Sequence, residues 1–279
     1  MKTRSLQSQS PDIIGRYLIS KAVTTALRPF LCIGFYLLVY LAANQLAFAQ
    51  TSTIIAKEIL DKVDDLWRGD SSHGTMSMTI TTAHWTRTLT IESWSKGKQK
   101  SLMRILAPKK EKGTTTLRSG NNIWNYLPKV KRVIKLPSSM MASSWMGSHF
   151  TNDDLVKESR MADDYTFTIT FRGEREGRDV GEVTCIPKPD AAIVWGKVVV
   201  MVEEESYLPI SLLYYDEDLN LARTMTFTDV GQMGGRIMPR LMRIIPTDKP
   251  QESTVIKYHE FVFNLPLKDT MFSLRSLQR

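Results

Sequence analysis

The sequence predicts a mainly β protein in which roughly ten or eleven strands form a single antiparallel sheet or barrel after one helix. Three observations lead to this fold class. Only residues 51–69 show strong helical spacing of apolar side chains. After Gly74 the apolar residues recur at every second position. The links between these alternating segments are short and rich in turn-forming residues.

Residues 51–69 place apolar side chains on one helical face, at Ile55, Ile59, Val63 and Leu66. Ser52 or Thr53 can cap the start of this helix, and Gly69 can end it. The segment is therefore the one long helix that we expect.

The alternation of strands is clearest in residues 165–171, where aromatic and isoleucine side chains alternate with threonines. Further strands are expected at residues 74–82, 86–94, 101–107, 121–127, 131–136, 181–186, 197–203, 209–215, 224–228, 236–245 and 254–263. Residues 137–164 form the only long irregular stretch, in which residues 151–159 can add a short helix.

The expected sheet is too wide for its single helix to cover. Ten strands at a spacing of ~4.8 Å span about 50 Å, whereas a helix is only ~10–12 Å across. Three arrangements would protect the apolar faces: a closed barrel filled by its own side chains, a sandwich, or an open half-barrel with an apolar cavity. The residues alone leave these three open.

If the sheet leaves a cavity, its apolar side chains are the candidate ligand contacts. On the strands these are Met76, Met78, Ile80, Leu89, Ile91, Trp124, Phe167, Ile169, Met225 and Phe227. On the irregular stretch they are Met140, Met141, Trp145, Met146 and Phe150. Methionine adapts to guests of variable shape, so this stretch would suit a flap over the cavity; the same side chains would equally serve as core fillers under a long loop.

Residues 1–49 have the features of a secretory signal peptide. A basic segment precedes an apolar run of 14 residues, 30–43, and Ala47-Phe48-Ala49 fits a cleavage site. The run is shorter than the ~20 residues that span a bilayer, although an uncleaved anchor is the alternative. We therefore expect an exported, periplasmic domain of residues 50–279, with Cys185 as its only cysteine and a net charge of about +4.

The sequence offers no recognisable catalytic or metal-binding pattern. The four histidines lie outside any metal-ligand spacing, and no phosphate-binding loop or nucleophile elbow occurs. Adjacent residues on a strand point apart, which argues against Ser148 and His149 as a catalytic pair. The acidic pair Asp153 and Asp154 fits a helix start, and the basic run 109–112 fits a solvated turn better than a lipid-headgroup site. We therefore expect no enzyme, no cofactor, no metal and no nucleic-acid partner.

Several strings match a known family. They are IWNYLPKVKRVIKLP, GSHFTNDDL, YLPISLLYYDEDLN and GGRIMP. Together they resemble the outer-membrane lipoprotein-sorting proteins, LolA/LolB-like, and within them a divergent branch associated with RND-type exporters. The resemblance covers about residues 51–277. His149 stands where the family usually has Asp, which puts any role of that carboxylate in doubt.

The resemblance implies a strongly curved antiparallel half-barrel, closed by helices, whose apolar cavity holds acyl chains. The arginine that helps to hold the lid closed in this family is not identified by the strings, and Arg104 could point inward or outward. The implied function is a monomeric periplasmic carrier of lipid or lipoprotein toward the outer membrane, with transient membrane contact and an RND-type transporter as partner. The alternatives are a lipid-sensing regulatory protein and a transporter-accessory protein on the same fold.

Overall fold

The computed structural model describes residues 40, 54–157, 161–189, 191 and 193–278. The expected signal peptide, residues 1–49, lies outside this part of the chain apart from residue 40. All the strands belong to one compact unit, residues 53–279. Within the described residues, no helix combines the length and apolar character needed to cross a bilayer.

The predicted N-terminal helix occupies residues 54–65. Ala56, Ile59, Leu60 and Val63 are buried, whereas residues on the other side are exposed. After one further turn Gly69 adopts a positive φ of 55°, which a left-handed position after a helix favours in glycine. The expected helix and its end are therefore confirmed.

Thirteen strands form one sheet in the order β6-β5-β4-β3-β2-β1-β13-β12-β11-β10-β9-β8-β7. They are β1 (Ser71–Thr81), β2 (Thr86–Lys96), β3 (Lys100–Ala107), β4 (Thr115–Ser119), β5 (Asn122–Leu127), β6 (Arg132–Lys135), β7 (Tyr165–Arg175), β8 (Arg178–Pro187), β9 (Lys197–Glu203), β10 (Pro209–Tyr215), β11 (Leu221–Met233), β12 (Arg236–Pro246) and β13 (Ser253–Phe263). Every pairing is antiparallel, and β1 joins the two meanders by pairing with β13.

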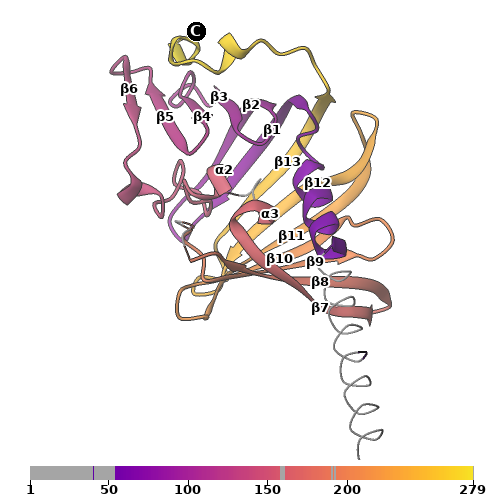
Figure 1. Ribbon diagram of the computed structural model, residues 1–279. Coiled ribbons are helices and arrows are strands. Elements are labelled where there is room, and N and C mark those ends of the chain that lie inside the picture. The colour runs from indigo at the N-terminus through magenta and orange to yellow at the C-terminus, as the bar shows by residue number, and fades with distance from the viewer. Residues whose placement is uncertain (1–39, 41–53, 158–160, 190, 192, 279) are drawn as a thin grey trace, which may run out of the picture. The chain divides into compact units, whose positions relative to one another are not determined.

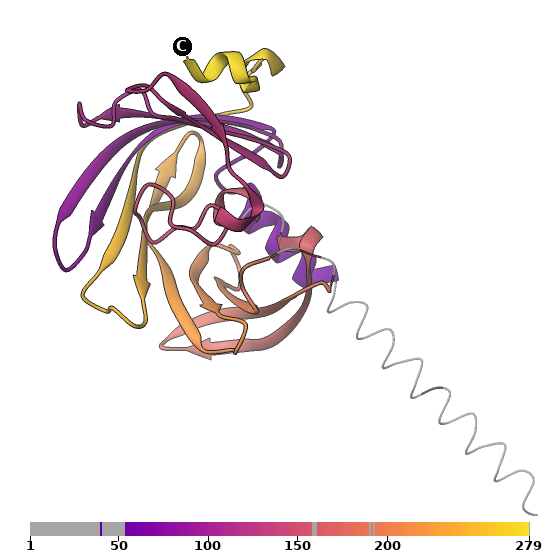
Figure 2. The ribbon, with the colours of Figure 1, turned by 90° about the vertical axis from the view of Figure 1, so that its left-hand side faces the viewer.

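The sheet is open and strongly curved, with β6 and β7 at its two edges (Figure 1). Figure 2 shows its two halves bending around the N-terminal helix, which lies on the concave side. The closed barrel and the sandwich are thus excluded, and the half-barrel prediction is confirmed. The sequence had predicted fewer strands, because residues 115–119 carry too few apolar side chains to be recognised as β4.

The stretch between β6 and β7 is irregular, as predicted. It contains a 3₁₀ turn, η1 (Ser138–Met140), and two single helical turns, α2 (Asp154–Lys157) and α3 (Met161–Asp164). The expected helix over residues 151–159 begins at Asp154 and its described part ends at Lys157. We call residues 137–155 the flap.

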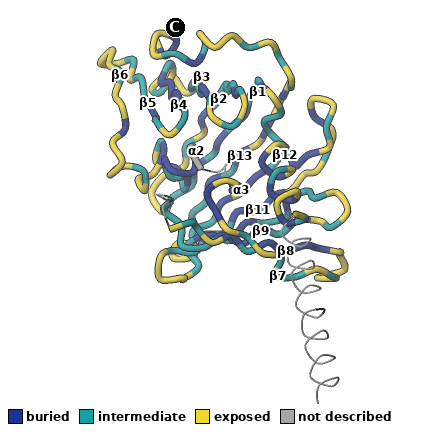
Figure 3. Tube along the Cα trace, viewed as in Figure 1, coloured by how far each residue is buried: buried dark blue, intermediate teal, exposed yellow. Residues whose placement is uncertain are grey.

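Two apolar clusters stabilise the sheet, one on each face. The inner cluster fills the concave side and includes the helix, the flap and inward side chains of most strands. The outer cluster lies on the convex side of β2–β5, under a C-terminal segment with the turns η2 (Asp269–Phe272) and η3 (Leu274–Gln278). Its buried members are Leu102, Leu117, Phe272 and Leu277. Figure 3 shows buried residues along the strands and exposed residues at the hairpin turns.

Candidate functional site

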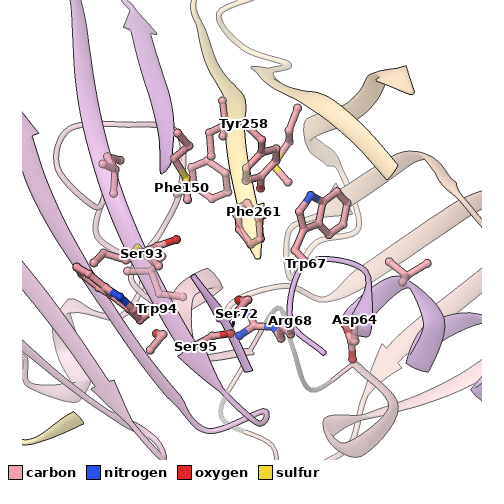
Figure 4. Close-up of a pocket in the computed structure, with 18 of the residues that line it drawn as sticks. Asp64, Trp67, Arg68, Ser72, Ser93, Trp94, Ser95, Phe150, Tyr258 and Phe261 are labelled. Carbon is pink, nitrogen blue, oxygen red and sulfur yellow. Dashed lines mark hydrogen bonds between the residues drawn. The ribbon is translucent and has the colours of Figure 1, made fainter. Parts of the chain in front are cut away.

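A pocket of about 150 Å³ lies inside the inner cluster, against the end of the N-terminal helix (Figure 4). Four parts of the chain build its walls: the helix end, strands β1–β3, strands β10–β13, and the flap with α3. The apolar lining consists of Val63, Trp67, Met76, Ile91, Trp94, Met103, Trp145, Phe150, Leu155, Met161, Leu212, Phe227, Met242, Ile256, Tyr258 and Phe261. Residues far apart in sequence thus enclose one mainly apolar space.

The part of the pocket nearest β1 and β2 is polar. Ser72, Ser93 and Ser95 lie here with Arg68 (Figure 4), and Ser101 and Asp64 are further polar residues of the lining. The hydroxyl groups of Ser72 and Ser95 are hydrogen-bonded to each other at 2.7 Å. The Nε1–H group of Trp67 is buried without a hydrogen-bond partner among the described residues. An apolar chamber with a few polar groups at one end is the usual composition of a site for a small amphipathic ligand.

An aromatic cluster forms the wall of the pocket on the β11–β13 side. The ring of Trp67 lies 5.4 Å from that of Phe227 and 6.0 Å from that of Tyr258. The rings of Tyr258 and Phe261 meet edge to face at 5.5 Å. Gly74 on β1 is required beside this cluster, because a Cβ atom at this position would lie 2.3 Å from the Phe261 ring.

The flap forms the opposite wall through two buried aromatic side chains. Trp145 and Phe150 both line the pocket. The indole Nε1–H of Trp145 donates a 3.2 Å hydrogen bond to the hydroxyl group of Thr116 on β4. The side-chain amide of Asn152 donates to the backbone carbonyl groups of Met140 and Ser143, at 3.0 and 3.1 Å. The bond to β4 and the two bonds within the flap make the flap a structured cover.

A buried ion pair fastens the flap to β11. The guanidinium group of Arg223 donates two hydrogen bonds of 2.7 Å to the two carboxylate oxygens of Asp154. Both side chains are only 4% exposed. The guanidinium group also donates to the carbonyl oxygen of His149 at 2.7 Å, and it lies 4.3 and 4.1 Å from the ring centroids of Trp195 and Tyr214. Arg223, which the sequence did not single out, thus bridges the sheet and the flap.

His149 provides a second connection, to the start of β13. Its Nδ1 atom lies 2.8 Å from the hydroxyl oxygen of Thr254, and its Nε2 atom lies 3.2 Å from a carboxylate oxygen of Glu252. A hydrogen bond from the backbone N–H of Ala83 and the one from His149 lower the pKa of Glu252. Where the family usually has Asp, this chain therefore has a histidine that connects the flap to the sheet.

The structure divides the predicted ligand contacts into three groups. Five of them line the pocket: Met76, Ile91, Trp145, Phe150 and Phe227. Eight others belong to the inner cluster or pack against it without lining the pocket: Met78, Ile80, Leu89, Met141, Met146, Phe167, Ile169 and Met225. Met140 is 46% exposed, and Trp124 packs against the outer cluster. Contact with a ligand remains a prediction for all of them.

Trp124 and Arg104 lie where strand alternation places them. On β5 it is Ile123 that enters the inner cluster, so the neighbouring Trp124 points to the outer one. On β3 Ile105 enters the inner cluster, and Arg104 lies beside Trp94, 5.4 Å from its ring centroid. Trp94 packs against the outer cluster, so of the two positions left open for Arg104 the structure shows the outward one.

The residues considered for chemistry have other contacts. The hydroxyl group of Ser148 donates to the backbone carbonyl of Trp145 at 2.7 Å, whereas the ring of His149 contacts Thr254 and Glu252. Burial raises the pKa of the Cys185 thiol to about 12, which makes its reactive thiolate scarce. Among the described residues, no group of His, Cys, Asp and Glu side chains has the arrangement of a metal site.

Comparisons with known proteins agree with this architecture. A family model with the description "Uncharacterized protein" matches residues 97–279, and no curated protein matches the chain. A solved outer membrane lipoprotein-sorting protein domain from Vibrio parahaemolyticus is 26% identical, with a TM-score of 0.71; the match covers 80% of this chain and 98% of that one.

Two further solved structures share the fold. A DUF1329 family protein from Desulfovibrio piger is 22% identical with a TM-score of 0.74, and the match covers 81% of this chain and 99% of that one. A LolA superfamily protein from Nitrosomonas europaea is 20% identical with a TM-score of 0.68, covering 79% and 98%. The chain thus belongs to the family that the matching model describes, and it has the fold of the LolA-like outer-membrane lipoprotein-sorting proteins.

Proposed function

We propose that this protein is a periplasmic carrier that binds acyl chains of a lipid or lipoprotein in the pocket beneath the flap. The observation that carries the proposal is an apolar pocket whose cover is joined to the sheet by polar contacts in addition to buried apolar side chains. Polar contacts can be exchanged for water when a cover lifts, whereas a fully apolar seal would expose its whole surface. The site is one for binding, and the carrier is not an enzyme.

The size of the pocket requires the flap to move. An apolar cavity of about 150 Å³ holds a benzene-sized guest. A chain of about sixteen carbons is far longer, although its burial would contribute ~0.8 kcal/mol per CH₂ group before ordering costs. We therefore infer that the described conformation is a closed one, and that cargo enters as Trp145 and Phe150 move outward.

The polar end of the pocket would receive the polar part of the cargo. The free indole N–H of Trp67 can donate to an ester or amide carbonyl group, and the serine hydroxyl groups can do the same. The acyl chain would then extend along Phe227, Met242 and Ile256. Delivery toward the outer membrane, and an RND-type transporter as the source of cargo, follow from the family resemblance.

The proposal is tested by looking for bound lipid and by filling the pocket. Protein purified gently from the periplasm should carry lipid in native mass spectrometry, and empty protein should take up a fluorescent fatty acid. Ser93→Phe places a ring in the pocket and should lower uptake at least about tenfold, the effect of ~1.4 kcal/mol of lost binding.

The matched control is Thr88→Phe, on the same strand but at an exposed position. It should bind fatty acid like the unaltered protein, with a similar melting temperature. Recovery of only empty protein, together with no uptake of the probe, would refute the carrier function. Equal uptake by Ser93→Phe and Thr88→Phe would show that the ligand binds elsewhere.

A further inference from the structure

Three hairpin turns gather at one end of the sheet. In the meander β1–β6, the turns at residues 82–85, 108–113 and 128–131 follow every second strand, so antiparallel pairing brings them to the same end. The turns at 108–113 and 128–131 are adjacent, because a Cβ atom on Gly113 would lie 3.6 Å from the side chain of Pro128. Arg87 lies over the ring of Trp85 and pairs with Glu111, which joins the first two turns. We call these three turns, with β6, the basic end.

Positive charge is concentrated at this end. Residues 108–152 contain eight lysine and arginine residues and one acidic residue, Glu111, whereas the rest of residues 50–279 contain 24 basic and 27 acidic residues. Seven of the eight are exposed: Lys109, Lys110, Lys112, Lys129, Lys131, Arg132 and Lys135. None of these seven forms an ion pair with a described carboxylate. The net charge of the domain is modest, but the surface of the basic end is strongly positive.

Exposed apolar side chains lie among these cations. Val130, at the tip of the β5–β6 turn, is 58% exposed, and Trp85, at the tip of the β1–β2 turn, is 42% exposed. Leu127 and Ile134 on the same hairpin are also exposed. Basic residues with interspersed apolar and tryptophan side chains are the composition of surfaces that bind the headgroup region of anionic membranes. An acidic protein partner would have no comparable need for a protruding valine and tryptophan.

The basic end borders the flap directly. The guanidinium group of Arg87 donates to the backbone carbonyl of Met146 and also contacts Glu111 in the 108–113 turn. The flap begins two residues after β6, and the exposed Met140 follows within it. A membrane in contact with this end would therefore face the cover of the pocket.

We propose that the basic end docks on an anionic phospholipid bilayer, with the cations at the headgroups and Val130 and Trp85 inserted between them. This inference extends the proposed carrier function, since it identifies the face through which cargo would pass. Docking itself does not require cargo, so vesicle binding can be measured on empty protein.

The test is flotation with vesicles of phosphatidylcholine alone or with phosphatidylglycerol added, using residues 50–279, which contain the whole compact unit. The protein should bind only the anionic vesicles, and less at high salt. The triple substitution Lys129→Glu, Lys131→Glu and Arg132→Glu should reduce binding at least about tenfold. Val130→Asp should also weaken it, with a smaller effect on its salt dependence.

The control reverses three exposed basic residues away from this end, Arg178→Glu, Lys257→Glu and Lys268→Glu, with the same change in net charge. It should retain vesicle binding. No binding to anionic vesicles, or an equal loss in the control, would overturn the docking proposal. Fatty acid uptake in solution should persist in the triple variant; its absence from every variant would instead contradict the carrier function and leave docking intact.

Discussion

Both faces of the sheet carry apolar side chains that must be covered from water, and the two covers are built differently. On the convex side, Phe272 and Leu277 from the C-terminal segment fill the space over Leu102 and Leu117. On the concave side, the helix and the flap leave a pocket, and the flap is joined to the sheet by Arg223 and His149. Under the proposed carrier function, the outer cover would serve stability and the inner one exchange with a ligand.

The largest expected effect comes from breaking the buried ion pair of the flap. Asp154→Ala leaves the guanidinium group of Arg223 buried without its carboxylate, and should lower the free energy of unfolding by about 3–5 kcal/mol. Urea denaturation measures this change, and hydrogen exchange should show faster exchange in residues 140–152.

The double variant Asp154→Leu with Arg223→Met is the control for this pair. Removing both members of the pair leaves neither of these two side chains as a buried ion without its partner, so much of the lost stability should return. A loss below about 1 kcal/mol in Asp154→Ala would mean that water reaches Arg223 and that the pair does not fasten the flap.

The ion pair also shows where sequence reasoning ends. The antiparallel strands, the helix and the irregular flap follow from local periodicity and turn residues, which act over a few positions, whereas the strong curvature of the sheet was implied only by the family resemblance. Asp154 and Arg223 are 69 positions apart, and their pairing depends on how the flap folds back over β11. A single sequence carries no local signal for such a contact.

Phe261 was missed for a different physical reason. The register between β1 and β13 shifts by one residue, because Thr75 pairs with Glu260 whereas Met76 pairs with Tyr258. This bulge turns Phe261 to the same side as Tyr258, although strict alternation would point it away. The outer cluster was also unforeseen, because the C-terminal segment that covers it has neither helical nor strand periodicity.

On the convex face we expect a substitution to change stability without changing fatty acid uptake. Leu277→Ala removes a fully buried side chain from the outer cluster and should cost about 2–5 kcal/mol. Fatty acid uptake by the folded variant should stay unchanged, because Leu277 does not line the pocket. Thermal or urea denaturation and uptake are measured on the same preparation.

Leu274 supplies the matched control, since it lies in the same turn but is largely exposed. Leu274→Ala should change stability by less than about 0.5 kcal/mol. If Leu277→Ala reduced uptake at a temperature where it is folded, the two faces would be coupled and the division of roles would be wrong.

A smaller effect is expected at Gly74 on β1, which packs against the aromatic wall of the pocket. Gly74→Ala introduces a Cβ atom against the ring of Phe261, and overpacking of this kind typically costs about 1–3 kcal/mol. The displaced ring should enter the pocket and reduce uptake of the probe. Adding Phe261→Leu should remove the clash with the ring but not the 2.6 Å contact with the backbone carbonyl oxygen of Glu260, so uptake should recover more fully than stability. Uptake unaffected by Gly74→Ala would place the ligand away from this wall.

The smallest expected effect is the loosening of the two covers, the flap and the C-terminal segment, at acidic pH. Each is held by a carboxylate whose pKa is lowered: Glu252 by the N–H of Ala83 and by His149, and Asp269 on the C-terminal segment by Lys96 and Lys100. A lowered pKa in the folded state contributes stability above the ordinary pKa of the group, and this contribution is lost as the pH falls through the folded value. Both covers should therefore loosen as the pH falls below about 4.5.

Two single substitutions distinguish the carboxylates. Glu252→Gln should make hydrogen exchange of the flap faster at neutral pH and remove its further increase on acidification, while the C-terminal segment still responds. Asp269→Asn should do the reverse. Because the pocket lies behind only one cover, acid release of a bound fatty acid should follow Glu252 and not Asp269; release that depends equally on both would show that the two faces open together.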